Sequence, residues 1–157
     1  MRKSVQFLLL FLMCISASWT WVSDAPERTV LFNMGDYDSQ YWRIPALVTA
    51  VDNSLVAVVD KRGGSLGDLP NTISIMSRRS TDNGKNWSEP VVVAQGGNGK
   101  TYGDPAVVLD KKTGNLICMF VGDQGLWNAT PYNRQGIYVS KSTDNGVSWS
   151  EPVAITD

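Results

Sequence analysis

A repeated peptide constrains this chain more than any other feature. The octapeptide Ser80-Thr-Asp-Asn-Gly-Lys-Asn-Trp87 recurs as Ser142-Thr-Asp-Asn-Gly-Val-Ser-Trp149, and each copy continues into Ser-Glu-Pro-Val. The copies start 62 residues apart, at positions 80 and 142. This period exceeds that of helical and leucine-rich repeats and suits one four-stranded β-propeller blade with long loops. We therefore expect an all-β fold in which this chain forms two blades.

The repeated peptide has the chemistry of a tight hairpin. Its Asn-Gly dipeptide suits such a turn because both positions tolerate positive φ. The preceding aspartate, Asp82 or Asp144, can accept hydrogen bonds from the turn's own N–H groups. The closing tryptophan, Trp87 or Trp149, can fill the gap between neighbouring sheets. Since the motif satisfies its own polar atoms, we interpret it as structural rather than catalytic.

Short β-rich runs between the turns predict four strands in each blade. The first blade is expected at residues 44–50, 54–60, 72–78 and 90–94, and the second at 106–109, 115–122, 136–141 and 152–156. Residues 29–34 would supply the outer strand of the last blade in a closed ring. Two further landmarks, Arg43-Ile-Pro45 and Gly103-Asp-Pro105, give nearly the same period, because their prolines are 60 residues apart.

The strand order predicts which segments meet. In an up-and-down blade, the chain enters the innermost strand at one end of the central channel and alternates ends thereafter. Arg43, Asp104 and the loops at residues 60–69 and 123–134 should then share one end, with both octapeptides at the other. Because long loops on a rigid scaffold commonly carry binding groups, we expect the functional site at the end that these loops share.

The first 18 residues have the features of an export signal. Arg2 and Lys3 precede an apolar run at residues 7–15 and small residues at 16–18, and the run is shorter than the roughly 20 residues of a membrane span. We expect cleavage near Ser18 and a secreted or periplasmic protein. A lipoprotein anchor at Cys14 is less favoured, because a bulky methionine precedes it. Residues 19–157 would then be the N-terminal part of a propeller, which needs about four to eight blades to close, so we expect a fragment of a longer protein.

Composition excludes several classes of function. Without residues 1–18, 12 Lys and Arg (14 less Arg2 and Lys3) face 15 Asp and Glu, so neither nucleic acid nor an anionic membrane is an expected partner. The chain has no histidine, which excludes His-based triads and His-ligated metal within it. We expect no metal and no cofactor. Cys118 lies in an apolar run and is expected to be a buried thiol.

The repeats and the Arg-Ile-Pro segment together resemble a known family. Both octapeptides match the Asp box of the propeller glycosidases, S-x-D-x-G-x-x-W. Arg43-Ile-Pro45 resembles the (F/Y)RIP motif on the innermost first strand of the bacterial exo-sialidases, with Trp42 at the aromatic position. The resemblance covers about residues 29–157 and implies a six-bladed propeller, of which this chain would hold the first two blades. Judged without it, an arginine before a strand is more often a solvated or salt-bridged residue.

The resemblance implies roles for five residues. Arg43 corresponds to the first of three arginines that clamp the carboxylate of sialic acid, and Asp68 to the acid/base aspartate. Arg62 and Asp104 correspond to positions around the sugar's 4-hydroxyl, and Trp127 is expected to wall the N-acetyl pocket. Without the resemblance, Asp68 would be interpreted as a turn residue before Leu-Pro. The family's nucleophilic tyrosine, partner glutamate and two further clamp arginines are expected outside this sequence. None of the following tyrosines has a context that matches the nucleophile: Tyr37, Tyr41, Tyr102, Tyr132 and Tyr138.

These observations favour one function and leave two alternatives. The favoured function is a secreted exo-α-sialidase that removes terminal sialic acids from glycoproteins, glycolipids or oligosaccharides with retention. Sialidases are the glycosidases that use a tyrosine nucleophile. A non-catalytic Asp-box propeller that binds glycans or proteins is the first alternative, and a propeller glycosidase for neutral sugars is the second. The arginine of the Arg-Ile-Pro motif, Arg43, and the spacing from Arg62 to Asp68 favour the sialidase.

Overall fold

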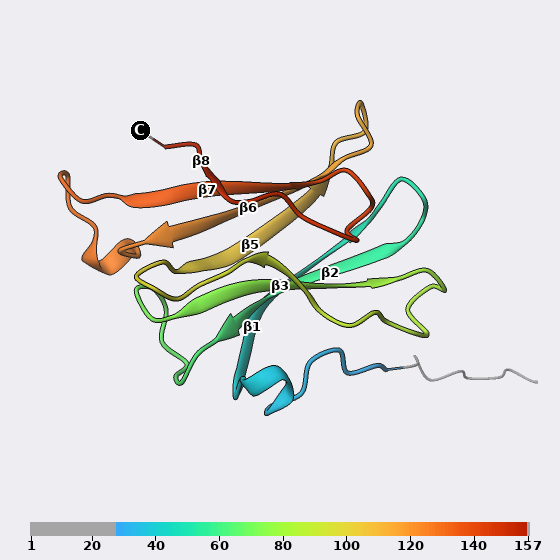
Figure 1. The fold of residues 1–157 in the computed structure, drawn as a ribbon, viewed down its shortest axis with the longest axis horizontal. Coiled ribbons are helices and arrows are strands. Elements are labelled where there is room, and N and C mark those ends of the chain that lie inside the picture. Colours follow the sequence, from blue (N-terminus) through green and yellow to red (C-terminus); the bar gives the residue numbers. More distant parts are fainter. Residues whose placement is uncertain (1–27, 157) are drawn as a thin grey trace, which may run out of the picture.

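Two four-stranded antiparallel sheets make up the part of the chain that the computed structural model describes, residues 28–156. Each sheet follows the chain order, and the two sheets are stacked face to face (Figure 1). The first sheet comprises β1 (Tyr41–Thr49), β2 (Leu55–Arg62), β3 (Ile73–Ser80) and β4 (Val91–Ala94), and the second β5 (Tyr102–Leu109), β6 (Leu116–Asp123), β7 (Gln135–Ser142) and β8 (Val153–Ala154). Two short 3-10 helices, η1 (Asp36–Asp38) and η2 (Leu126–Asn128), complete the elements. The predicted all-β fold with two blades is confirmed.

The innermost strands start earlier than their sequences predict. β1 begins at residue 41 rather than 44, and β5 at 102 rather than 106. Both strands pass through an irregularity, between Arg43 and Ala46 in β1 and at the equivalent place in β5. There Ile44 and Asp104 adopt φ values of 53° and 56°. A bulge frees the next position from the hydrogen-bond ladder, so a proline can follow within the strand.

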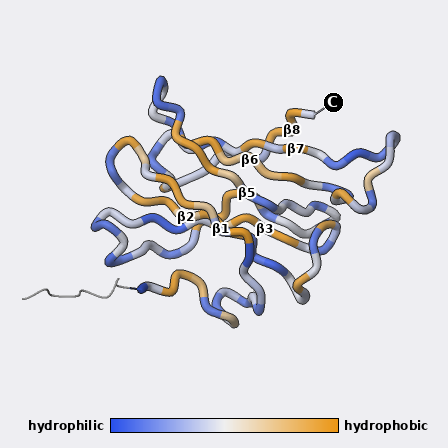
Figure 2. The backbone as a smooth tube through the Cα atoms, turned by 180° about the vertical axis from the view of Figure 1, so that it is seen from behind, coloured by the Kyte–Doolittle hydropathy of each residue, from blue (hydrophilic) through white to orange (hydrophobic). Residues whose placement is uncertain are grey.

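The core lies between the two sheets. Figure 2 shows that the facing strands carry the more hydrophobic stretches of the chain. The second octapeptide closes this joint, because Trp149 Nε1 donates to Ser77 Oγ at 3.0 Å and Arg79 Nε donates to the Asn145 carbonyl at 3.0 Å. Cys118 is buried as predicted, and burial raises the pKa of its thiol to about 12, so it is not a reactive cysteine. The residues at the centre of the core are Val56, Val58, Ile75, Leu116, Cys118 and Phe120.

Both octapeptides form the predicted stapled hairpins. In the first, Asp82 accepts hydrogen bonds from Ser80 Oγ at 2.8 Å and from the Asn86 N–H at 2.8 Å. In the second, Asp144 accepts from Ser142 Oγ at 2.7 Å and from the Ser148 N–H at 2.9 Å. The hydrogen bonds from Asn86 are the main reason that the pKa of Asp82 falls to about 2. The hairpin chemistry read from the repeat is confirmed.

The two long loops leave the opposite end of the sheets from the octapeptides (Figure 1). The loop between β2 and β3, residues 63–72, and the loop between β6 and β7, residues 124–134, lie at the end where β1 and β5 begin. The predicted division between a structural end and a loop-bearing end is therefore present. We call the loop-bearing end the mouth.

The second sheet leaves one apolar face open within the described residues. Val108, Met119 and Val153 are 58%, 46% and 61% exposed on the side away from the first sheet. The equivalent positions in the first sheet include Val56 and Val58, which the second sheet buries completely. The open face thus has the composition of a surface on which another blade packs.

Residues 29–34 form no strand among the described residues, which do not include the last blade that the segment was expected to join in a closed ring, so that expectation stays a prediction. This segment folds back onto its own blade, where the Phe32 ring lies 4.5 Å from that of Trp42 and Arg78 lies 5.7 Å above Phe32. Arg78 also donates to the Leu31 carbonyl. The expected export signal, residues 1–18, lies outside the described residues. Over residues 28–156, no helix is long and apolar enough to cross a membrane.

Candidate functional site

Three of the five predicted site residues meet at the mouth of the first blade. Asp68 Oδ1 lies 2.6 Å from Arg62 Nη1 and 3.6 Å from Arg43 Nη1. Arg43 extends from the start of β1, Arg62 ends β2, and Asp68 follows on the loop. Both arginines also donate to the Leu66 carbonyl, Arg43 at 3.3 Å and Arg62 at 2.7 Å. The loop is therefore folded over two guanidinium groups.

The two arginines differ in how accessible they are. The Arg43 side chain is 42% exposed, and its polar contacts are at 3.3 and 3.6 Å. Such long contacts leave its planar fork available for a bidentate anion. The Arg62 side chain is 1% exposed, and its Nη1 also donates to the Gly67 carbonyl at 2.8 Å. Direct contact between Arg62 and a sugar hydroxyl would require the loop to move, so that predicted role stays a prediction.

Asp60 is a buried carboxylate beneath this cluster. It is 0% exposed and accepts a hydrogen bond from Arg62 Nη2 at 2.9 Å and another from the Asp104 N–H at 3.2 Å. Burial raises the pKa of Asp60 above its ordinary value, and the hydrogen bond and charge of the Arg62 guanidinium oppose that shift. Sequence reasoning assigned Asp60 no role. The sequence could have indicated this contact, because Asp60 lies two residues before Arg62 on one strand, and side chains two residues apart on a strand lie on the same face.

A cavity of about 210 Å³ brings the other predicted residues to the same mouth. Asp68 and Asp104 line it from the two blades, and Trp127, which is 86% exposed, stands beside them on η2. The two long loops touch here, because a Cβ on Gly125 would lie 2.6 Å from the Leu69 carbonyl oxygen. The full lining consists of Asp68, Leu69, Asp104, Gly125, Leu126, Trp127 and Gln135. Gln135, at the start of β7, was not predicted; its amide can both donate and accept.

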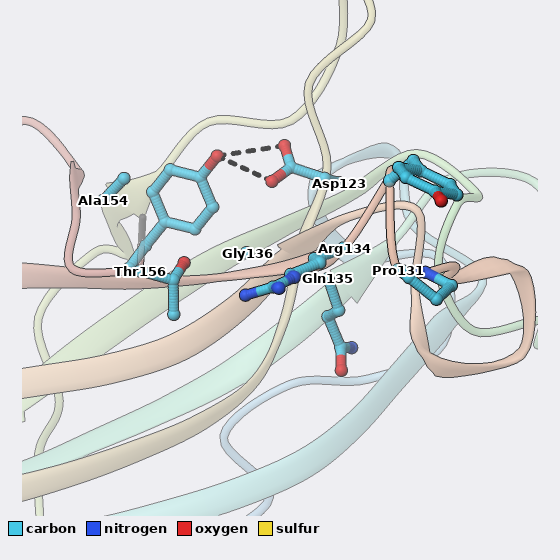
Figure 3. Close-up of a pocket in the computed structure, with 9 residues that line it drawn as sticks. Asp123, Pro131, Arg134, Gln135, Gly136, Ala154 and Thr156 are labelled. Carbon is cyan, nitrogen blue, oxygen red and sulfur yellow. Dashed lines mark hydrogen bonds between the residues drawn. The ribbon is translucent and has the colours of Figure 1, made fainter.

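A larger cavity of about 450 Å³ lies on the other side of Gln135 (Figure 3). Its walls include Arg134 and Asp123, whose two carboxylate oxygens share the single O–H of Tyr138, each 2.9 Å from the hydroxyl oxygen. Burial, with the hydrogen bond to Asp123, raises the pKa of Tyr138 to about 12. Tyr138 is therefore protonated at neutral pH, and its O–H is held by the Asp123 carboxylate. Over residues 28–156, no group of three or more Cys, Asp or Glu side chains is placed to hold a metal ion.

Comparisons with known proteins agree with this architecture. Residues 53–157 match the family of BNR repeat-like domains. A sialidase of Bacteroides fragilis (strain YCH46) is 33% identical over 142 residues, which cover 78% of this chain and 26% of that protein. A sialidase of Micromonospora viridifaciens is 35% identical over 128 residues, which cover 74% of this chain and 20% of that protein.

Solved structures show the same arrangement of strands. The structure of Hadza microbial sialidase Hz136 superposes with a TM-score of 0.70 at 32% identity, over 78% of this chain and 27% of that one. A leech intramolecular trans-sialidase superposes with a TM-score of 0.72 at 16% identity, over 84% of this chain and 37% of that one, and supports the fold alone. The chain spans 26% and 20% of the length of the Bacteroides fragilis and Micromonospora viridifaciens sialidases, and 37% of the length of each of two clostridial relatives, from Paraclostridium sordellii and Clostridium perfringens.

Proposed function

Since the chain belongs to the sialidase family with BNR repeats, we propose that the whole protein is an exo-α-sialidase. It would hydrolyse terminal sialic acids from glycoproteins, glycolipids or oligosaccharides with retention of configuration. The observation that carries the proposal is the convergence of a half-exposed arginine, a loop aspartate and a small cavity at one mouth.

Arg43 is proposed to bind the substrate's carboxylate. Its guanidinium is 42% exposed, and its contacts with Asp68 and the Leu66 carbonyl are long. A substrate carboxylate could replace both contacts with two short charge-assisted hydrogen bonds, each worth about 1.5–3 kcal/mol. A neutral sugar offers no group that would use this fork, which favours an acidic sugar as the substrate.

Asp68 is proposed as the acid/base residue. Its side chain is 56% exposed and lines the cavity, so it can reach the oxygen of a departing group. Cleavage of a glycosidic bond needs a proton for that oxygen, and a carboxyl group at the mouth can supply it. Trp127 and Asp104 are proposed to contact the sugar's substituents from the second blade.

The nucleophile and the remaining carboxylate-binding arginines are proposed to come from parts of the protein outside this sequence. The chain covers about a quarter of the B. fragilis relative, and the open face of the second sheet is suited to a further blade. We also propose export through residues 1–18, to the periplasm or out of the cell. On its own, this chain would bind a sialoside incompletely and would not turn it over.

The test is hydrolysis of a fluorogenic sialoside by the full-length protein. Arg43→Ala should lower kcat/KM at least about a hundredfold, since the loss of a bidentate ion pair costs about 3 kcal/mol. Arg43→Lys should recover little, because an ammonium lacks the planar fork. The matched control is Arg79→Ala, an arginine of the same blade at the octapeptide end. Near-parental kcat/KM in both Arg43 variants would show that the clamp is assigned wrongly.

A further inference from the structure

We propose that Asp60 is a positioning residue that holds the Arg62 guanidinium, and through it the loop bearing Asp68, in place at the mouth. The effect on sialoside hydrolysis rests on the function proposed above, whereas the effect on the position of the loop does not. Asp60 and Arg62 form a buried ion pair, and neither residue lines the 210 Å³ cavity.

The Arg62 guanidinium is divided between two sets of partners. Its Nη2 donates to Asp60 Oδ2 at 2.9 Å. Its Nη1 donates to the carbonyls of Leu66 and Gly67 and to Asp68 Oδ1, at 2.7, 2.8 and 2.6 Å. Because the guanidinium is planar, fixing one nitrogen fixes the direction in which the other points. Asp60 thus sets the orientation from which Arg62 holds three consecutive loop residues.

Asp60 also reaches the second blade. Its Oδ1 accepts a hydrogen bond from the Asp104 N–H at 3.2 Å. The approach is close because the preceding residue is glycine: a Cβ on Gly103 would lie 2.8 Å from Leu69 Cδ1 and 3.6 Å from Asp60 Oδ2. Asp68 and Asp104 form opposite sides of the 210 Å³ cavity. Both sides are therefore positioned by the two oxygens of one carboxylate.

Burial explains why the pair acts as an anchor. Asp60 is 0% exposed, the Arg62 side chain is 1% exposed, and Arg62 Nε is buried without a hydrogen-bond partner among the described residues. If Asp60 lost its charge, Nη2 would lose its anionic partner, and Asp68, which is 56% exposed, would be the remaining one. A buried cation without a buried counter-charge is strongly unfavourable. Arg62 would then move toward solvent, and the loop that it binds would move with it.

The first test measures the loop directly, by hydrogen exchange of residues 63–71 in the full-length protein with mass spectrometry. Asp60→Asn, which keeps the side-chain shape, should speed exchange in this segment at least tenfold. The matched control is Asp52→Asn, because Asp52 pairs with Arg79 at the other end of the same blade; it should leave residues 63–71 unchanged. Equal exchange in wild type and Asp60→Asn would overturn the proposal.

A second variant keeps this test decisive if Asp60→Asn does not fold. Arg62→Lys retains the buried charge opposite Asp60, but a single ammonium cannot hold Asp60 and the three loop acceptors together. It should speed exchange in residues 63–71 to a similar degree. A protected loop in Arg62→Lys would refute the anchoring role.

The activity test asks whether Asp60 acts through Asp68. On a sialoside with a poor leaving group, Asp60→Asn should lower kcat/KM at least tenfold, with a smaller loss on an aryl sialoside that needs little protonation. Added to Asp68→Asn, it should cause less than a twofold further loss on the poor substrate, because coupled residues are not additive. Fully additive losses would overturn the proposal. If the wild-type protein hydrolyses no sialoside, the proposed function fails, and the exchange experiment still decides the role of Asp60.

Discussion

Gly146, in the second octapeptide, offers a direct test of the joint between the blades. Its φ is +85°, and a Cβ there would lie 2.8 Å from Val56 Cγ2 and 3.0 Å from Val56 Cγ1. An L-residue in this left-handed conformation costs about 1–2 kcal/mol. Because Val56 is 0% exposed and cannot retreat, overpacking adds about 1–3 kcal/mol. Gly146→Ala should therefore lower the free energy of unfolding by about 2–5 kcal/mol.

The control is Gly114→Ala, at the same end of the second sheet. Gly114 has a φ of +76°, but its Cβ would meet Val51 Cγ1 at 3.5 Å, an ordinary contact, so only the backbone cost of about 1–2 kcal/mol applies. Urea unfolding followed by tryptophan fluorescence measures both variants. In a Val56→Ala background, which removes the clashing methyl groups, Gly146→Ala should cost no more than Gly114→Ala. Equal destabilisation of the two glycine variants in the wild-type background would refute the packing of the second octapeptide against Val56.

Two further predictions concern pH and association. Hydrogen bonds from Asn86 lower the pKa of Asp82 to about 2 in the folded state, below the ordinary value near 3.9. Between about pH 4 and 2 the unfolded chain therefore binds a proton that the folded state does not, and this group makes stability fall as pH falls. Melting temperatures across that range should show a flatter profile in Asp82→Asn than in wild type, and parallel profiles would contradict it. Residues 28–157 produced alone should self-associate through the face that bears Val108 and Met119, and Met119→Lys should shift sedimentation toward the monomer.

The fold could be predicted because its signals are local and repeated. Asn-Gly turns and alternating apolar runs specify hairpins over a few residues, and two copies of the same landmarks define the blade. All eight strands were expected within four residues of their observed starts and ends. The starts of β1 and β5 were expected three and four residues too late, next to Pro45 and Pro105, because proline is disfavoured inside a strand. Here bulges at residues 44 and 104 accommodate the prolines.

The site was only partly predictable, because residue type does not determine which way a side chain turns. Arg43 and Arg62 both lie at the mouth end of the first sheet, but one is half exposed and the other is buried. The difference arises from the loop, since the carbonyls of Leu66 and Gly67 come to rest on the Arg62 side chain. No local sequence pattern predicts those backbone contacts. The resemblance to a family predicts which chemical role Arg62 has, but it does not predict that a loop covers its side chain.

Burial of Arg62 also explains why a second carboxylate is needed at this mouth. An arginine covered by a loop cannot depend on Asp68 alone, because Asp68 is exposed and, as the proposed acid, must be free to act on the substrate. On the assignment proposed above, Asp60 supplies a buried counter-charge at 2.9 Å, so that Arg62 can stay in place while Asp68 changes partners. The two carboxylates share one guanidinium but have different surroundings, 0% and 56% exposed. We therefore expect Asp60→Asn to disturb the position of the loop, and Asp68→Asn to remove the proton transfer to the substrate.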